Sequence, residues 1–342
     1  MLLNDRTFFD VAAENPKSFF QTRVNVPPRS LEQREERLNK AREMFMRNPK
    51  MVHVRNNLGD TPLIVSILSS EKEMVRLLLE YGADANETGQ DDSSPLELAI
   101  KRNGNPEIVS MLLEHGADPY YTNRHGQTLL MSAGGYFPAD YRYPDPQADP
   151  EANFRRMLDF TQDINQLNHA GGTALHSIDQ AAFIPLLCAR GAELNIRDNS
   201  GKAPLHYYVE VGCQETVALV KTFLRYGPDV NVQDNDGCTP LYYASCVDGP
   251  DEEVVSLLLA AGADPNFHDK KWGYTPLHLA VMTHYWEIIP QLVEAGADVN
   301  LRDKEGRTPL KRLLDYDYDL AARFGHGDER IEAYLRRAGA HP

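Results

Sequence analysis

Two histidines and an aspartate near residue 270 are among the side chains best suited to chemistry. His268 and Asp269 are adjacent, and His278 or His284 could join them. Imidazole and carboxylate groups are common zinc ligands. The surrounding pattern, however, places these residues on a loop and at two different helix positions. A structural role for each is therefore favoured over a shared metal ion.

The remaining reactive residue types lack the spacing that catalysis or ligand binding requires. Aspartate and tyrosine alternate over 315–319, without the glycine-punctuated ligand spacing of a calcium loop. Neither a phosphate-cradling glycine loop nor a nucleophile elbow occurs. No two cysteines have the two-residue spacing of a zinc or redox motif, and they are Cys188, Cys213, Cys238 and Cys246. We therefore predict no catalytic, cofactor-binding or metal-binding residues, and reduced thiols.

One tripeptide recurs along most of the chain and defines the elements that must position these side chains. Its consensus is Thr-Pro-Leu, and subtracting successive start positions gives spacings of 33, 34, 45, 30, 36, 36 and 33 residues. The eight copies begin at Thr61, Ser94, Thr128, Thr173, Ala203, Thr239, Thr275 and Thr308. A recurring period of about 33 residues indicates a repeat architecture.

A second signature, Gly-Ala-Asp or a variant of it, follows most copies. Gly82, for example, comes 21 residues after Thr61 (82 minus 61), and an apolar run with helical spacing lies between them at 75–79. Threonine caps a helix N-terminus, and proline fits the first helical position because its missing N–H would be unpaired there. Glycine supplies the left-handed conformation that ends a helix. One unit therefore reads helix, turn, helix, loop.

The loops between units are predicted to form hairpin-like fingers. Aspartate and glycine recur in them at 198–201, 234–237 and 303–306, where aspartate bonds the local backbone and glycine tolerates positive φ. From about residue 51 to 341, these motifs resemble the ankyrin-repeat family, whose repeat carries Thr-Pro-Leu-His at its first helix. Histidine fills the fourth motif position at His176, His206 and His278, whereas other residues stand there at Ile64, Glu97, Tyr242 and Lys311.

The chain is expected to be an all-α ankyrin solenoid of eight helix-turn-helix repeats with short fingers and a helical N-terminal cap. Residues 1–50 would form an N-terminal extension and capping helix, with the charge-rich helix at 31–47, and residues 51–342 the repeat domain. Insertions near 134–150 and 315–328 are predicted to leave the same edge. The fourth repeat is short, with Pro185 expected inside its second helix.

Asparagines recur just after the Gly-Ala-Asp signature, and we expect them to bridge backbone groups in the fingers. They are Asn86, Asn195, Asn231, Asn266 and Asn300. The resemblance also implies that some asparagines at such positions are hydroxylated by an oxygenase in animal hosts.

The charge balance narrows the class of partner. Lys and Arg number 35 against 50 Asp and Glu, a formal charge of −15 with a pI near 5.2. Such a surface repels nucleic acid and anionic lipid and favours a partner with a basic surface. No run approaches the ~20 apolar residues that span a bilayer, and the N-terminus has no apolar signal region. We expect a cytoplasmic protein, or a nucleocytoplasmic one in a eukaryote, that is monomeric on its own.

The resemblance implies that a partner lies across the fingers and inner helices, which together form a concave face. Tryptophan is enriched in binding hot spots, so Trp272 is the first candidate, although it could instead pack on a neighbouring finger. Tyr207 and Tyr243 occupy equivalent positions in successive repeats and would form an aromatic strip or pack between helices. The further candidates are Lys270, Lys271, Asn235, Asp236, Tyr285, Trp286, Tyr136, Tyr141 and Tyr143.

Three classes of function remain. The first is a binder that holds one partner protein and thereby inhibits or masks it. The second is an adaptor that recruits a client to a larger complex, for which the insertion edge would supply a second surface. An enzyme is the least favoured class. The sequence does not name the partner or the pathway.

Overall fold

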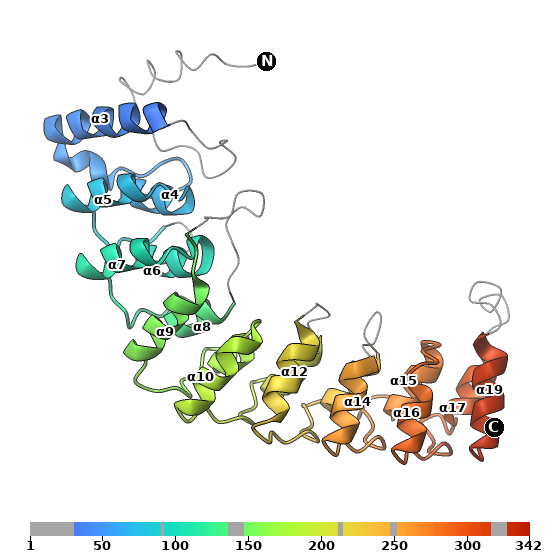
Figure 1. The fold of residues 1–342 in the computed structure, drawn as a ribbon. Helices are drawn as coiled ribbons and strands as arrows, with labels where there is room; N and C mark the ends of the chain where they lie inside the picture. The colour runs from blue at the N-terminus through green and yellow to red at the C-terminus, as the bar shows by residue number, and fades with distance from the viewer. Residues whose placement is uncertain (1–30, 90–91, 136–146, 211–214, 247–251, 316–326) are drawn as a thin grey trace, which may run out of the picture. The chain divides into compact units, whose positions relative to one another are not determined.

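The computed structural model describes residues 31–89, 92–135, 147–210, 215–246, 252–315 and 327–342. The chain divides into two compact units, residues 1–169 and 170–342. Each unit consists of paired helices joined by long loops (Figure 1). Among the described residues the only β pairing is an isolated bridge between Thr122 and Thr128. The expectation of an all-α repeat fold is therefore confirmed.

The first unit holds three helix pairs behind an N-terminal helix. The inner members are α4, α6 and α8, and the outer members are α5, α7 and α9. The bounds are α3 (Leu31–Arg47), η1 (Pro49–His53), α4 (Pro62–Leu68), α5 (Lys72–Glu80), α6 (Pro95–Leu98), η2 (Ala99–Asn103), α7 (Pro106–Glu114), α8 (Leu129–Gly134) and α9 (Pro150–Phe160).

Helix α3 forms the predicted N-terminal cap, with the predicted bounds. Its Ala41 and Phe45 are fully buried, and the Phe45 ring lies 5.5 Å from that of Tyr81 at the end of α5. Arg37 also forms an ion pair with Glu71 at 2.5 Å. An end repeat needs an apolar inner side and a polar outer side, and the exposed charged residues of α3 supply the latter.

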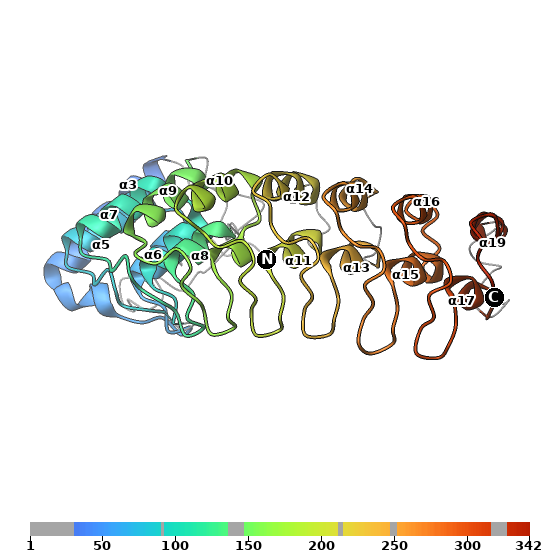
Figure 2. The same ribbon diagram turned by 90° about the horizontal axis from the view of Figure 1, so that it is seen from below.

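The second unit continues the same plan. Figure 2 shows its inner helices α11, α13, α15 and α17 in one row, the outer helices in a second row, and the fingers extending on the inner side. The bounds are η3 (Ala174–Ser177), η4 (Ala181–Phe183), α10 (Ile184–Ala189), α11 (Pro204–Glu210), α12 (Thr216–Leu224), α13 (Pro240–Ala244), α14 (Glu252–Ala260), α15 (Pro276–Met282), α16 (Ile289–Glu294), α17 (Pro309–Asp315) and α19 (Gly327–Arg337).

The fourth repeat departs from the expected helix pair. Its inner element is only the 3₁₀ turn η3, whereas its second helix, α10, holds Pro185 in its first turn. Pro185 therefore lies inside the second helix, as expected, and is the second residue of a helix that begins at Ile184. Proline is well tolerated there, since the N–H groups of a first helical turn have no partner within the helix.

Helix starts and repeat junctions follow the motif. The Thr61 hydroxyl accepts a hydrogen bond from the Ile64 N–H at 3.3 Å. At the junctions, Asn231 donates to the Gly262 carbonyl at 3.0 Å and accepts from the Asp264 N–H at 2.8 Å. The same pair of bonds recurs at Asn86, Asn266 and Asn300. Within its own unit, each of these four asparagines therefore joins two successive repeats by bonding backbone groups, as expected from their recurrence.

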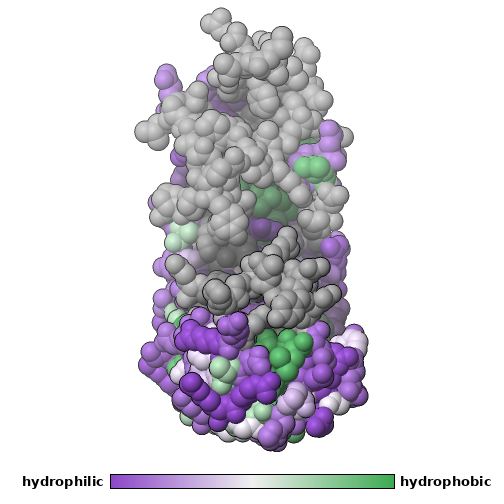
Figure 3. Space-filling model, turned by 90° about the vertical axis from the view of Figure 1, so that its right-hand side faces the viewer, coloured by the Kyte–Doolittle hydropathy of each residue, from purple (hydrophilic) through white to green (hydrophobic). Residues whose placement is uncertain are grey.

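The core of each unit is apolar and lies between the two helix rows. Leu78 in α5 and Leu258 in α14 are fully buried. Tyr208 is fully buried as well, and its hydroxyl donates to the Leu175 carbonyl at 2.6 Å. The last repeat has a mainly hydrophilic end face with one smaller hydrophobic area, seen in the lower part of Figure 3.

Candidate functional site

Each finger of the second unit is built around one aspartate. Asp234 shows the pattern: its Oδ1 accepts from the N–H groups of Asp236 and Cys238, both at 2.9 Å. Asp198, Asp269 and Asp303 do the same in their own fingers. A carboxylate that accepts several N–H bonds fixes a tight turn without help from a sheet.

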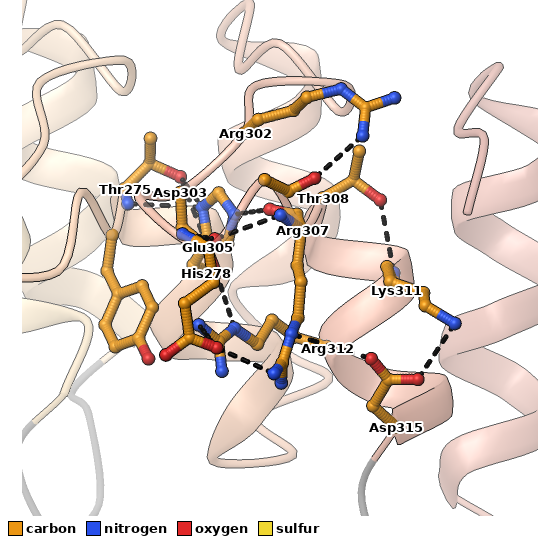
Figure 4. Close-up of polar contacts among 12 residues, drawn as sticks. Thr275, His278, Arg302, Asp303, Glu305, Arg307, Thr308, Lys311, Arg312 and Asp315 are labelled. Carbon is orange, nitrogen blue, oxygen red and sulfur yellow. Dashed lines mark hydrogen bonds and ion pairs between the residues drawn. The ribbon is translucent and has the colours of Figure 1, made fainter.

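In Asp198, Asp234 and Asp303 the second oxygen holds the finger to the inner helix that follows it. The Tyr207 hydroxyl donates to Asp198, and the Tyr243 hydroxyl donates to Asp234 at 2.6 Å. In the last repeat this position is Arg312, whose Nε donates to Oδ2 of Asp303 at 2.5 Å (Figure 4).

The seventh repeat replaces this contact. Leu279 stands at the tyrosine position, and the finger has one extra residue. Oδ2 of Asp269 therefore takes the Tyr274 N–H at 2.8 Å instead.

Neighbouring finger tips are tied together by backbone hydrogen bonds. Asn235 N–H donates to the Ser200 carbonyl at 3.0 Å, Lys270 N–H to Asp236 at 2.7 Å, and Lys304 N–H to Trp272 at 2.9 Å. Gly201, at φ +81°, permits the approach, since a Cβ there would lie 2.6 Å from the Asn235 nitrogen. These bonds hold the finger tips in a fixed row in the chain alone.

Tyr207 and Tyr243 lie on this row's inner-helix side, and a lysine stands between them. Lys202 Nζ is 4.2 Å from the Tyr243 ring centroid and 5.7 Å from that of Tyr207, while pairing with Glu210 at 2.6 Å. Both tyrosines are half-buried. Lys202 therefore makes cation–π contacts with both rings, and the aromatic strip consists of two tyrosines with a lysine between them.

The hydroxyls of these two tyrosines act as hydrogen-bond donors. Burial, together with the bond to Asp198, raises the pKa of Tyr207 to about 12. Burial and the bond to Asp234 raise the pKa of Tyr243 as well. Each phenol therefore stays protonated at neutral pH, and the carboxylate oxygen that it contacts remains satisfied.

Trp272 is both packed and exposed. Its ring stacks on Tyr274 of the same finger, with centroids 6.3 Å apart and planes at 16°, and Lys271 Nζ lies 4.9 Å from its centroid. Even so, 45% of the residue is exposed. The sequence left open whether Trp272 is free for a partner or packs on a neighbouring finger. In the structure it packs on Tyr274 of its own finger, which has one extra residue, and it is also exposed.

A network of charges supports the last finger (Figure 4). Glu305 pairs with Arg307 at 2.7 Å and with Arg312 at 3.3 Å, and the Arg312 guanidinium lies 5.0 Å from the Tyr274 centroid. Burial alone would raise the pKa of Asp303, but the Arg307 N–H and the Arg312 guanidinium bring that pKa below its usual value. Sequence reasoning missed Arg312, although it shares the register position of Tyr207 and Tyr243.

The other aromatic candidates differ in setting. Trp286 is half-buried, edge-on to Tyr334 at 5.4 Å, and the Arg330 guanidinium lies 3.8 Å from its ring centroid. Tyr285 beside it is half-buried too. Tyr136, Tyr141 and Tyr143 lie outside the described residues. Asn235 and Asp236 are exposed at their finger tip.

The motif histidines serve the scaffold. His278 accepts from the Thr275 N–H at 3.2 Å through Nδ1, and its Nε2 lies 3.1 Å from the Arg307 carbonyl of the next finger. His176 and His206 make the corresponding bonds. Burial lowers the pKa of all three imidazoles, which therefore stay neutral.

Within the part of the chain that the structure describes, no three His, Cys, Asp or Glu residues form a group that could hold a metal ion. Asp269 is already occupied by backbone N–H groups. Cys188, Cys238 and Cys246 are free thiols, and Cys213 lies outside the described residues. No described helix is both long and apolar enough to cross a bilayer.

Comparison with known proteins gives consistent matches. A family model of ankyrin repeats in three copies matches residues 35–123, 179–269, 214–303 and 245–324. The Caenorhabditis elegans ANK repeat-containing protein nipk-1 is 28% identical over 173 residues, 50% of this chain and 23% of that protein. Human B-cell lymphoma 3 protein is 30% identical over 175 residues, 49% of this chain and 28% of that protein.

A further relative is the chicken nuclear factor NF-kappa-B p105 subunit. It is 28% identical over 200 residues, 56% of this chain and 18% of that protein. The chain thus spans less than a third of the length of each of these three relatives.

Proposed function

The chain belongs to the ankyrin-repeat family, and from that premise we propose that it binds one specific partner protein through the fingers and inner helices of its second unit. Ankyrin repeats are protein-interaction modules that use extended surfaces of this kind. The proposal places the contact on the fixed row of finger tips and on the half-buried tyrosines beside it.

The proposal rests chiefly on Trp272, which is exposed although its finger is held in place. The residue is 45% exposed, yet the finger that bears it is fixed by three N–H bonds to Asp269. Exposed tryptophan is costly to leave in water and is favoured in hot spots. A rigid finger also loses little conformational entropy on binding. Trp272 therefore has the properties of an anchor residue.

Neighbouring residues extend the proposed contact along the row. Asn235 and Asp236 present polar groups at the adjacent tip, and Tyr207 and Tyr243 offer ring surface beside Lys202. An aromatic anchor surrounded by polar groups is the usual anatomy of an interface.

The finer form of the proposal is that the chain masks or inhibits its partner and is monomeric when alone. A rigid, capped repeat array needs no catalytic residue for that role. The net charge of −15 favours a partner whose body carries a basic surface. Free thiols at the three described cysteines fit a reducing compartment such as the cytoplasm, or the nucleocytoplasm of a eukaryote.

Capture of the partner tests the proposal. The intact chain is expected to retain a discrete protein from host extract, and Trp272→Ala should weaken its affinity by about tenfold or more, the loss typical of a hot-spot residue. Tyr226→Ala is the matched control, because Tyr226 is 41% exposed but lies at the end of outer helix α12. Retention by Trp272→Ala together with loss by Tyr226→Ala would overturn the proposed surface.

A further inference from the structure

The two finger tips around Trp272 carry cations without counter-charges. Lys270, Lys271, Arg302 and Lys304 are exposed, and among the described residues none of them takes part in an ion pair. Their polar bonds go to backbone carbonyls: Lys270 Nζ donates to Asn235 at 3.1 Å and Arg302 to Gly306 at 2.7 Å, and Lys304 Nζ donates to Lys270. We call these four cations and Trp272 the cationic finger patch.

Most other cations on the same face are paired with carboxylates, whereas Arg197 bonds to the Gly201 carbonyl at 2.9 Å and to Oδ1 of Asn235 at 3.4 Å. Lys202 pairs with Glu210 at 2.6 Å, Arg307 with Glu305 at 2.7 Å, and Lys311 with Asp315 at 2.9 Å. The chain has a large excess of carboxylates, so a shortage of acids does not explain the difference. The patch is thus a local concentration, on two adjacent fingers, of cations that no described carboxylate neutralises.

The cationic finger patch also reverses the sign of the charge along the row of finger tips. Lys270-Lys271 stands where the preceding finger has Asn235-Asp236, and the backbone bond from Lys270 to Asp236 aligns the two tips. Lys304 is tied in turn to the Trp272 carbonyl at 2.9 Å. The ammonium groups and the exposed indole are therefore held on adjoining loops of fixed geometry.

We propose that the cationic finger patch docks an acidic segment of the partner, with one apolar or aromatic side chain of that segment against Trp272. This rests on the proposed function and specifies the chemistry of its contact. The Arg302 fork can bind a carboxylate in bidentate geometry, and the lysine ammonium groups act as point charges. The indole supplies the apolar part of the contact.

The short range of charge interactions explains how a cationic patch can act on a protein whose net charge is negative. Charges are screened over about 8 Å at physiological salt, so the net charge acts on the approaching partner while the four cations act on the segment in contact. Nucleic acid fits less well, because single-strand binders stack successive bases on several aromatic residues. Here Trp272 stacks on Tyr274, and of these two residues Trp272 is exposed whereas Tyr274 is half-buried.

The charge at the patch can be read from Trp272 fluorescence. Trp272 and Trp286 are the two tryptophans of the chain, so Trp286→Phe leaves Trp272 as the sole reporter. At physiological ionic strength, the ratio of iodide to caesium quenching is expected to exceed the ratio measured for free N-acetyltryptophanamide. Lys270→Glu/Lys271→Glu/Lys304→Glu should lower the ratio below that of the free indole. A wild-type ratio equal to or below that of the free indole would overturn the local charge on which the proposal stands.

Docking is tested on the same reporter with four probes: equal-length peptides bearing one phenylalanine among acidic, basic or neutral residues, and a single-stranded oligothymidine. The acidic peptide is expected to shift the Trp272 emission to shorter wavelength and to bind about tenfold or more tightly than the neutral one. The triple charge reversal should abolish this preference, whereas Lys221→Glu, on exposed outer-helix surface, should leave it unchanged.

The outcomes separate this inference from the proposed function. Preference for the basic peptide or for oligothymidine, or no preference among the peptides, would overturn the proposal that the patch docks an acidic segment. If a captured partner still depended on Trp272, protein binding by the fingers would stand. Capture of no partner would instead overturn the proposed function, even if the acidic peptide bound.

Discussion

At the scale of single residues, the fingers depend on how each aspartate divides its two oxygens. One oxygen closes the finger turn, and in Asp198, Asp234 and Asp303 the other holds the following helix. In Asp234 the second contact comes from the Tyr243 hydroxyl at 2.6 Å, and the aspartate is only 3% exposed. Water has little access to replace a lost partner there, so both contacts contribute to the rigidity of the tip.

Removing one hydroxyl should therefore lower stability measurably. Tyr243→Phe is expected to decrease the free energy of unfolding by about 1 to 3 kcal/mol, because a buried carboxylate oxygen loses its donor. Urea denaturation measures the change. Tyr226→Phe, which removes the hydroxyl of an exposed tyrosine, should stay within about 0.5 kcal/mol. Equal effects of the two changes would argue against the finger contact.

The motif histidines make stability depend on pH. Burial lowers the pKa of His278 in the folded state, so the unfolded chain binds protons first as the pH falls. The stabilisation is present above the unfolded pKa of about 6.5 and is lost progressively below it. Comparing wild type with His278→Gln by urea denaturation tests this. The advantage of wild type should shrink between neutral pH and about pH 5.5, and a constant difference would contradict it.

At the scale of elements, the repeat motif determines where helices begin and how they pack. The Thr-Pro-Leu positions, the glycine ends and the cap at 31–47 could be predicted because each rests on local backbone chemistry. The reduced inner turn of the fourth repeat could not, because short apolar stretches do not distinguish an α-helix from a 3₁₀ turn. Arg312 escaped notice because Lys311-Arg312 looks like surface charge until the Asp303 contact is seen.

Trp272 marks the limit of prediction within the site. Its finger position followed from the sequence, but stacking on Tyr274 depends on how one extra residue reshapes the turn around Asp269. Whether the proposed contact residues bind a partner stays a prediction, as do the domain boundary at residue 50 and the role of the insertions, most of which lie outside the described residues.

Packing between helices should dominate stability at this scale. Leu258→Ala, at a fully buried position in α14, is expected to cost about 2 to 5 kcal/mol through lost transfer free energy and a residual cavity. Leu314→Ala, at a position that is 42% exposed in α17, should cost well under half as much. Thermal or urea unfolding measures both, and a Leu258→Ala change below about 0.5 kcal/mol would rule out this packing role.

At the scale of the whole molecule, the two units share one construction, in which asparagine bonds and backbone bonds between fingers join successive repeats. The proposed binding surface is therefore already formed in the chain alone. In the proposed function, the overall negative charge would act on the approaching partner and the cationic finger patch on the segment in contact. For the proposed function, the second unit must bind its partner on the finger side.

Hydrogen–deuterium exchange on the chain, alone and with its captured partner, tests that claim most directly. The partner should slow exchange in the fingers at 234–238, 269–274 and 303–307, and leave the outer helices α12, α14 and α16 unchanged. Protection confined to those outer helices, with the fingers exchanging as in the free chain, would contradict the account.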